Sequence, residues 1–339
     1  MSDKRKYHQY SLMQRGLIAA LFFLFLIRGF SQDPHFSQFY ANPLYLNPAL
    51  AGTAECSRIM FNYRNQWPSL SSGFKTYAFS ADSYISALSG GIGVAVFSDD
   101  AAGMINTLRL GGIYAFHLKL NEFSTLNMGL EGAYFQRKLN WDDLVFSDMI
   151  NYADGTVLQG ISAEQVPDRL TVSAADFSLG FLYAYHEKFY LGLAGHHLTE
   201  PAIGYYNSTD ESLYRKYTAH AGAIFTLIDG DYKTGRGKLI LNPNVLYQQQ
   251  QNAQQLNLGV NMELMPLVAG VWYRYNFKNP DGIIFLLGLK QKRFKFGYSY
   301  DLTMSELAGE SGGAHELSLT LFLNCDKRNK PGAIKCPEF

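Results

Sequence analysis

The chain has 339 residues, of which 47% are hydrophobic, 15% aromatic and only 17% charged. This apolar content excludes a mainly disordered chain, and a charged share below the roughly 25% of soluble domains favours a protein that exposes apolar side chains to lipid. The formal net charge of +0 gives no reason to expect a nucleic-acid partner.

Residues 1–31 predict a signal peptide. Lys4, Arg5 and Lys6 precede an uninterrupted apolar run from Leu17 to Ile27. That run is shorter than the ~20 residues of a membrane-spanning helix, but it has the length of a secretory apolar region. We expect cleavage between Ser31 and Gln32, the alternative being a short membrane anchor.

Residues 32–56 predict an irregular segment. It contains two Asn-Pro steps, Asn42–Pro43 and Asn47–Pro48, and such steps suit neither a helix nor a paired strand. The segment is nevertheless rich in Phe, Tyr and Leu side chains that require burial. We therefore expect a plug-like segment that packs into or under the periplasmic mouth of a barrel, the alternative being a disordered tail.

Residues 57–324 alternate between apolar and polar side chains, as from Glu316 to Leu323, and this alternation predicts β-strands with one apolar face. We predict an all-β fold, a transmembrane antiparallel β-barrel of about 14 strands in the outer membrane, although a soluble sandwich could show the same pattern. Pro243 interrupts the ninth segment and predicts a bulge or kink there. The fourteen segments begin near Arg58, Phe74, Gly91, Asn106, Ser124, Ala175, Lys188, Lys216, Gly237, Gln254, Val268, Gly282, Arg293 and Ala314.

The connections between these segments fall into two classes. Those of odd number include the long ones, around Leu139–Ala174, Leu198–Arg215 and Asp301–Gly313, whereas those of even number are mostly short, such as Tyr185–Lys188 and Lys290–Arg293. Outer-membrane barrels have long extracellular loops and short periplasmic turns. With the mature N-terminus in the periplasm, the long connections are therefore predicted to face outward.

Charged side chains on the polar faces of these segments predict an interior charge network. Such charges need partners once water is displaced, which favours a plugged interior or a narrow channel over a wide pore. The residues concerned are Arg64, Asp82, Arg109, Glu131, Arg274, Lys295 and Glu316.

Catalytic and metal-binding motifs are weak, and we expect no enzymatic activity and no cofactor. His196 and His197 are neighbours on a predicted strand, so they should point to opposite faces and not chelate a metal. The glycines of 90–96 lack the spacing of a dinucleotide-binding loop. A solvated acidic loop explains Asp142, Asp143, Asp148 and Asp154 better than a calcium site does.

Aromatic and methionine side chains in two long loops are candidate anchors for a protein partner. The alternatives are contact with lipopolysaccharide and packing of these side chains on one another. The candidates are Trp141, Phe146, Met149 and Tyr152 in one loop and Tyr205, Tyr206 and Tyr214 in the other.

The three cysteines are Cys56, Cys325 and Cys336, and an oxidising periplasm favours a disulfide. Cys56 precedes the first strand and Cys325 follows the last, so barrel closure would bring them to one rim and allow a clasp. Cys325–Cys336, which would tie back the periplasmic tail 325–339, and Cys56–Cys336 remain open as alternatives.

Two sequence blocks carry a family resemblance. FSQFYANPLYLNPALAG (Phe36–Gly52), followed by NYRNQWP (Asn62–Pro68), resembles the opening of the PorP/SprF family of type IX secretion system outer-membrane proteins. Three later blocks, 76–82, 91–103 and 296–302, and the ending CPEF agree. The motif residues are Phe36, Asn42, Pro43, Tyr45, Asn47, Pro48, Gly52, Tyr63, Arg64, Asn65 and Trp67.

This resemblance implies an outer-membrane barrel similar to the long-chain fatty-acid transporter type, without known catalysis. It implies a role in protein secretion and gliding motility, with a secreted adhesin or other cargo carrying a type IX C-terminal signal as partner. Other members link the export machine to periplasmic proteins. The alternative is a passive transporter of small hydrophobic molecules. A transporter requires a continuous apolar tunnel with a lateral opening, whereas an interaction protein would have a lumen blocked by residues 32–52.

Overall fold

The computed structural model describes residues 33–54, 56–70, 73–154, 156–157, 162–208, 211–230, 237–277, 279–304 and 312–323. The chain divides into two compact units, Met1–Asp33 and Pro34–Phe339. The second unit contains the strands and all the side chains discussed below. The predicted signal peptide lies outside the described residues.

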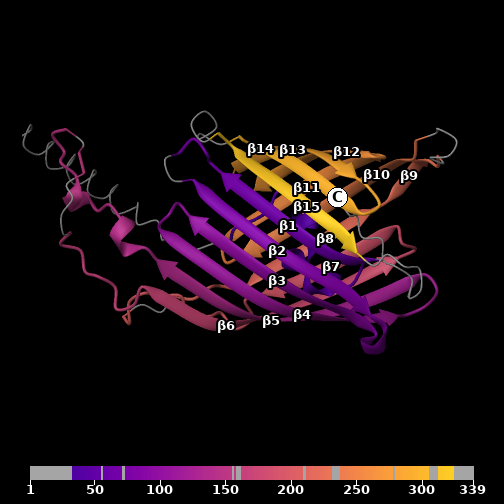
Figure 1. Ribbon diagram of the computed structural model, residues 1–339, viewed down its shortest axis with the longest axis horizontal. Helices are drawn as coiled ribbons and strands as arrows, with labels where there is room; N and C mark the ends of the chain where they lie inside the picture. The colour runs from indigo at the N-terminus through magenta and orange to yellow at the C-terminus, as the bar shows by residue number, and fades with distance from the viewer. Residues whose placement is uncertain are drawn as a thin grey trace, which may run out of the picture. The chain divides into compact units, whose positions relative to one another are not determined.

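The second unit consists mainly of β-strands (Figure 1). Its short helices are η1 (Phe39–Ala41), α2 (Pro43–Leu46), η2 (Pro48–Leu50), η4 (Trp141–Asp143) and η5 (Ser147–Met149), and η3 (Ser86–Leu88) forms a turn. The strands are β1 (Ser57–Gln66), β2 (Phe74–Ile85), β3 (Gly90–Ala101), β4 (Ile105–Lys119), β5 (Ser124–Leu139), β6 (Thr171–Tyr185), β7 (Phe189–His196), β8 (Lys216–Ala223), β9 (Phe225–Ile228), β10 (Leu239–Gln250), β11 (Ala253–Leu264), β12 (Leu267–Asn276), β13 (Asn279–Lys290), β14 (Phe294–Thr303) and β15 (Ala314–Leu323). Among the described residues, no helix has the length and apolar character needed to cross a membrane.

The strands form one closed antiparallel barrel. Strands that follow each other in sequence are paired, except β8 and β9, which both pair with β10. β10 also pairs with β11, and β1 pairs with β15. Because β8 and β9 are two parts of one strand interrupted at Ile224, the 15 strands make a barrel of 14. The fold prediction is therefore confirmed, and β6, which begins at Thr171 instead of near Ala175, starts earlier than the sequence pattern indicated.

The irregularity expected at Pro243 appears mainly in the strand beside it. β10 continues through Pro243, which faces Val260 of β11. On its other side, β10 pairs with β9 up to Leu241 and with β8 from Asn244 onward, so the break at Ile224 lies opposite the proline. Proline has no backbone N–H to donate to a ladder, which explains why the pairing is interrupted at this point.

Side chains alternate between a polar interior and an apolar exterior. On β6, Asp176 and Ser178 are buried while Phe177, Leu179 and Phe181 are exposed, and most other strands show a similar alternation, although β9 is exposed throughout. A soluble sandwich would bury its apolar face, whereas a membrane barrel turns that face toward lipid. The alternation in this sequence therefore belongs to an outer-membrane barrel.

The two ends of the barrel differ in their connections. The long-loop end carries 67–73, 102–104, 140–170, 197–215, 251–252, 277–278 and 304–313, and the short-turn end carries 86–89, 120–123, 186–188, 229–238, 265–266 and 291–293. The predicted parity holds for the longest connections. It is less clean than expected, because 251–252 and 277–278 are short connections at the long-loop end and 229–238 is a longer connection at the short-turn end.

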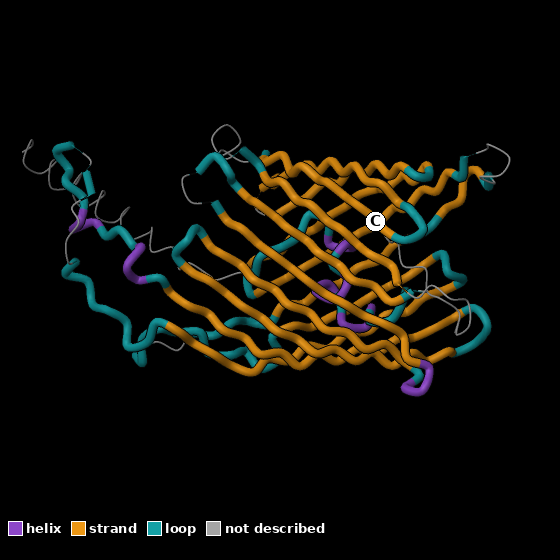
Figure 2. Tube along the Cα trace, viewed as in Figure 1, coloured by secondary structure: helices purple, strands orange, loops and turns teal. Residues whose placement is uncertain are grey.

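Residues 34–54 lie inside the barrel, where Figure 2 shows their short helices among the strands. The sequence predicted no helix here, and that prediction was wrong. Asn42 and Asn47 are the N-cap residues of α2 and η2, and each following proline is the first helical residue. Proline is well tolerated at this position because its missing N–H would have no helical partner anyway, so each Asn-Pro step starts a short helix.

Candidate functional site

The N-terminal segment, residues 34–54, contacts strands around the barrel wall. Its hydrogen bonds reach β14 and β15 from Gln38, β6, β7 and β8 from Asn47, and β2 from Gly52. Phe36, Leu44 and most other residues of the segment are buried. The segment therefore crosses the interior and does not line only one side of it.

Glu316 of β15 anchors the beginning of this segment. Its carboxylate accepts hydrogen bonds from the backbone N–H groups of Ser37 at 2.7 Å and Gln38 at 3.0 Å. The Gln38 amide donates to Ser299 Oγ at 3.1 Å and accepts from Ser318 Oγ at 2.6 Å. Gln38 is fully buried, and these bonds satisfy its side chain at both ends.

Asn47 anchors the middle of the segment. Its side-chain Nδ2 lies 3.1 Å from Phe181 O, 3.2 Å from Leu193 O and 3.1 Å from His220 Nε2. Its Oδ1 accepts the N–H of Ala49 at 2.9 Å and thereby caps η2. One amide thus joins the second Asn-Pro step to β6, β7 and β8.

Asp82 of β2 anchors the end of the segment. Its carboxylate accepts the Gly52 N–H at 2.6 Å and two bonds from the Arg58 guanidinium at 2.9 and 2.7 Å. Arg58 also donates to Leu50 O at 3.0 Å. Gly52 has a φ of +71°, and a Cβ there would lie 2.4 Å from Gly91 Cα. Only glycine fits this position.

Glycines of the barrel wall make room for the segment. A Cβ on Gly129 of β5 would lie 2.3 Å from Ala49 N, and one on Gly180 of β6 would lie 2.0 Å from Asn47 Oδ1. These distances are far below van der Waals contact. Inward glycines of the strands therefore fit the segment's backbone closely.

Aromatic rings fill the remaining space around the segment. The Phe39 ring meets Trp272 of β12 at a centroid distance of 4.9 Å, edge to face. Tyr45 stacks on Phe97 of β3 at 5.1 Å, and Phe36 packs edge-on against both of these rings. These contacts satisfy the need for burial that the sequence indicated.

The predicted interior charges are all buried, and most form ion pairs. Arg64 contacts Asp301 at 3.2 Å and Glu316 at 3.3 Å, and Arg274 contacts Asp301 at 2.5 Å. This first cluster also includes Asp281, which pairs with Arg274. The predicted burial is thus confirmed for all seven charges, and ion pairs are present at Arg64, Asp82, Arg109, Glu131, Arg274 and Glu316, while Lys295 lies over the Phe322 ring.

A second cluster lies around Arg109 of β4. Arg109 contacts Glu131 at 2.8 Å and Asp176 at 3.3 Å, and Asp176 also contacts His197 Nδ1 at 2.8 Å. The partners Asp176, Arg58 and Asp301 were not among the charges predicted from the sequence. All three occupy inward positions of alternating strands, so their place in the alternation could have identified them.

His196 and His197 are both buried, and the prediction that they point to opposite faces was wrong. β7 ends at His196, and His197 has a φ of +55° in the following turn. The strand alternation therefore stops between them. His196 Nε2 lies 3.3 Å from Leu46 O, and His197 contacts Asp176. Each histidine has its own structural partner, and the described residues hold no group of three or more metal-ligating side chains.

The motif residues divide between the interior and the wall. Those of residues 36–52 and Arg64 meet inside the barrel, whereas Tyr63 lies outside and packs on Tyr77 at 5.0 Å. Trp67 begins the connection 67–73 with a φ of +59°, and its N–H donates to Gly313 O at 2.8 Å. Tyr63, Asn65 and Trp67 therefore belong to the wall and its rim.

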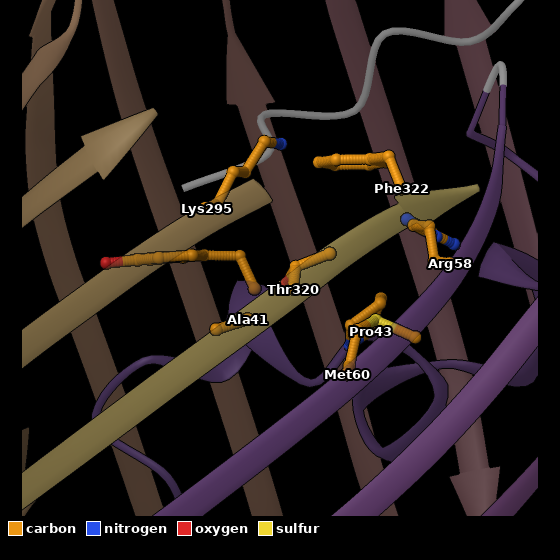
Figure 3. Close-up of a pocket in the computed structure, with 8 residues that line it drawn as sticks. Ala41, Pro43, Arg58, Met60, Lys295, Thr320 and Phe322 are labelled. Atoms are coloured by element: carbon orange, nitrogen blue, oxygen red, sulfur yellow. The ribbon is translucent and has the colours of Figure 1, made fainter. Parts of the chain in front are cut away.

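A small pocket lies beside the segment near the short-turn end (Figure 3). The Nζ atom of Lys295 is 5.0 Å from the centre of the Phe322 ring, and the guanidinium of Arg58 hydrogen-bonds to Asp82. The lining residues are Tyr40, Ala41, Pro43, Arg58, Met60, Lys295, Thr320 and Phe322. The pocket belongs to the interface between the segment and the seam of β1, β14 and β15.

The predicted loop anchors are only partly exposed. Tyr152 is 80% exposed and Tyr214 is 38% exposed, whereas Trp141, Phe146, Met149, Tyr205 and Tyr206 are half-buried. Trp141 packs on Phe146 at 4.9 Å, and this pair follows the alternative of packing within the loop. Burial raises the pKa of Tyr205.

The connections 140–170 and 197–215 hold each other. Arg169 donates its backbone N–H to Tyr205 O at 3.2 Å and its Nε to Gly204 O at 3.0 Å. Tyr206 Oη donates to Gln165 O at 2.8 Å. The two connections therefore form one surface at the long-loop end, which we call the loop surface.

Cys56 immediately precedes β1, whose first residue Ser57 pairs with Leu323 of β15. The seam that the sequence predicted is therefore present. Cys325 and Cys336 lie outside the described residues, as does the tail 325–339, and the choice of pairing stays a prediction.

Several solved structures of outer-membrane proteins are similar to this chain. The P. putida toluene transporter TodX has 9% identity and a TM-score of 0.48, with coverage of 82% of this chain and 92% of that chain. The CymD monoaromatic hydrocarbon channel has 11% identity, a TM-score of 0.46 and coverage of 84% and 93%. A Pseudomonas aeruginosa FadL homologue has 14% identity, a TM-score of 0.38 and coverage of 78% and 90%.

A search of curated proteins found no match. The model of one family, the type IX secretion system membrane protein PorP/SprF, matches residues 29–321. That range includes the N-terminal segment and nearly all of the barrel. The chain therefore belongs to the PorP/SprF family of type IX secretion system membrane proteins.

Proposed function

We propose that this protein is a non-enzymatic outer-membrane barrel that binds a secreted cargo or adhesin at its long-loop end. Binding would serve the export of that protein or its attachment to the cell surface, as in gliding motility. The observation that supports this proposal is the occupied interior: residues 34–54 cross the barrel and hydrogen-bond to strands on several sides. A barrel filled in this way is better suited to binding than to conduction.

In this proposal the N-terminal segment is a plug. Three anchors at Glu316, Asn47 and Asp82 hold it over its whole length. A transporter of small hydrophobic molecules would need a continuous apolar tunnel, but many of the inward side chains here are charged or amide groups that lie among the apolar ones. Moving the plug would leave those buried groups without partners, which is costly. We therefore favour a fixed plug.

The loop surface is the proposed binding site. Besides Tyr152, it exposes Val145, Val157 and Val166, each at 50% or more. Exposed apolar side chains on an ordered, polar-rimmed surface are typical of the anchors of protein interfaces. In the outer membrane we place this end toward the outside, because the longer loops of such barrels are extracellular.

The test is affinity purification of the tagged full-length protein from the membrane in mild detergent, with identification of the proteins that co-elute. We expect a large secreted protein, and we expect its yield to fall at least tenfold in the double variant Tyr152→Ser, Val157→Ser. Leu120→Ser is the control at the short-turn end, because Leu120 is as exposed as Val157, and this variant should leave the yield unchanged.

Two results would contradict cargo binding at this surface. One is a secreted protein that co-elutes equally with the loop variant. The other is co-elution of periplasmic ring proteins alone, which would favour a role as a core component that links the export machine to the periplasm.

A further inference from the structure

Strand β9 at the short-turn end is an unpartnered sheet edge. It is the last strand in the order of the sheet and pairs only with β10. The strand on that side is β7, which begins only at Phe189. Because Phe189 pairs with Ala223, the last residue of β8, β7 does not extend alongside β9. The N–H of Ile224 still reaches Lys188 O at 2.8 Å. Within the described part of the chain, no strand lies along the free edge of β9.

The side chains of β9 are as unusual as its edge. Phe225, Leu227 and Ile228 are exposed by 43%, 58% and 49%, and all four residues of the strand are exposed. Elsewhere in the barrel one face of each strand is covered by the interior. Long or apolar exposed edges are places where another strand can add, and natural proteins usually protect them with charge, proline or a covering loop.

Only one kind of surrounding satisfies both features of β9. Lipid would cover the apolar side chains but would leave the backbone N–H and C=O groups of the edge without partners, which does not occur in membrane proteins. Water would satisfy the backbone but would leave the apolar side chains hydrated, which is unfavourable. A protein strand provides hydrogen bonds and apolar contact together.

A second copy of this chain does not fit the edge. Two copies inserted in the same direction are related by an axis along the membrane normal. With the usual strand tilt of about 35–45°, two β9 strands facing each other across that axis would cross at roughly 70–90°, twice the tilt. Strands at such an angle cannot form a ladder. A strand of a different protein is free of this symmetry constraint and is the occupant that we favour.

We propose that β9 is a docking edge for an extended β-strand of a second protein at the short-turn end, with apolar side chains at alternate positions beside Phe225 and Leu227. This site lies at the end of the barrel opposite to the 140–170 connection (Figure 1). It is separate from the loop surface, and each site can be present without the other.

The first test uses the full-length protein in detergent micelles and measures hydrogen exchange at those amides of residues 225–228 whose N–H groups point away from β10. The probe is a blocked decapeptide of four Val-Thr repeats flanked by lysines. At saturation we expect these amides to exchange at least tenfold more slowly. The matched control is the same peptide with N-methyl groups on its two central valines, which keeps the side chains but removes the donors that pair with a strand; it should give no slowing.

Three results of this test would overturn the proposal. No slowing with the unmodified peptide would mean that the edge does not accept a strand. Equal slowing with both peptides would indicate apolar adsorption. Slow exchange of these free-edge amides before any peptide is added would show that another part of this chain already covers the edge.

The second test places a photo-reactive phenylalanine analogue at Phe225 or Leu227 in cells, with Leu70 of the long-loop end as the control position. We expect crosslinks from both β9 positions to alternate residues of one segment of one different protein, and none to that segment from Leu70. Crosslinks only to lipid or to a second copy of this chain would overturn the proposal.

Discussion

The N-terminal segment and the loop surface are both irregular and both rich in aromatic side chains, yet they use these features differently. The segment buries its rings and bonds to the wall through Glu316, Asn47 and Asp82. The loop surface bonds mainly to itself, through Arg169 and Tyr206, and leaves apolar side chains exposed. The comparison teaches that aromatic content alone does not identify a binding surface. The deciding question is whether the aromatic side chains are already buried, and the backbone already hydrogen-bonded, against the barrel wall.

The largest expected effect is the loss of an anchor inside the barrel. Glu316→Ala would leave the buried Arg64 guanidinium and the N–H groups of Ser37 and Gln38 without their shared acceptor. Breaking a buried pair by removing one partner costs about 3–5 kcal/mol. We expect a decrease of this size in the free energy of unfolding, measured by urea titration in detergent.

The control for this prediction is on the loop surface. Glu164 is exposed, and Glu164→Ala should change the free energy of unfolding by no more than about 0.5 kcal/mol. Equal losses in both variants would contradict the view that the interior, unlike the loop surface, depends on fixed ion pairs.

The next effect concerns the fit between the segment and the wall. A Cβ on Gly129 would lie 2.3 Å from Ala49 N, whereas one on Gly112, in the preceding strand, has no atom within 4 Å. Overpacking costs typically about 1–3 kcal/mol, so Gly129→Val should displace residues 34–54. We expect chymotrypsin to cut within the segment in this variant.

Gly112→Val supplies the matched comparison, because it adds the same side chain where there is space. Its segment should remain as resistant to chymotrypsin as in the natural sequence. Cleavage at equal rates in both variants would mean that the close fit at Gly129 does not hold the segment in place.

A smaller effect on the free energy of unfolding should distinguish the asparagines of the two Asn-Pro steps. Asn47 uses its side chain to bond Phe181 O and Leu193 O and to cap η2, whereas the side chain of Asn42 caps no helix. Leaving buried polar groups unpaired costs about 1–3 kcal/mol. Asn47→Ala should therefore lower the free energy of unfolding by about this amount, and Asn42→Ala by less. The reverse order in urea titrations would refute the assigned role of Asn47.

Much of the barrel was predictable because strand alternation is a local pattern. Parity along each strand assigned Arg64, Arg109 and Glu316 to the interior before any partner was known. The helix starts at Pro43 and Pro48 are also local signals, which the sequence analysis misread. The position of residues 34–54 inside the barrel and the need for glycine at position 129 depend instead on contacts with distant strands. These contacts join residues that are far apart in sequence, and no local pattern reports them.

One further error and one feature that the sequence analysis did not predict have the same origin. The alternation rule failed at His197 because β7 ends one residue earlier, at a backbone turn that the residue types do not mark. The exposed edge of β9 results from the different lengths of β7 and β10, and strand length is set by pairing on both sides. A local pattern thus indicates the face of a residue more readily than the limits of its strand.

The smallest effect distinguishes the loop surface from the segment by its response to pH. Hydrogen bonds from the Ala163 N–H at 2.6 Å and from Ser162 Oγ hold the pKa of Asp148 below its usual value of 3.8. A lowered folded pKa means that this contribution to loop order is present above the unfolded pKa and is lost as the pH falls through the folded pKa.

The Ala163 amide should consequently be protected at neutral pH and lose protection below about pH 3.8, after correction for the intrinsic pH dependence of exchange. Asp148→Asn removes the titrating group and should leave the protection of Ala163 independent of pH in this range, while amides of residues 37 and 38 behave alike in both proteins. A pH profile at Ala163 that is unchanged by the substitution would show that Asp148 does not order this part of the loop surface. In that case the loop surface, like the segment inside the barrel, would be ordered mainly by contacts distant in sequence.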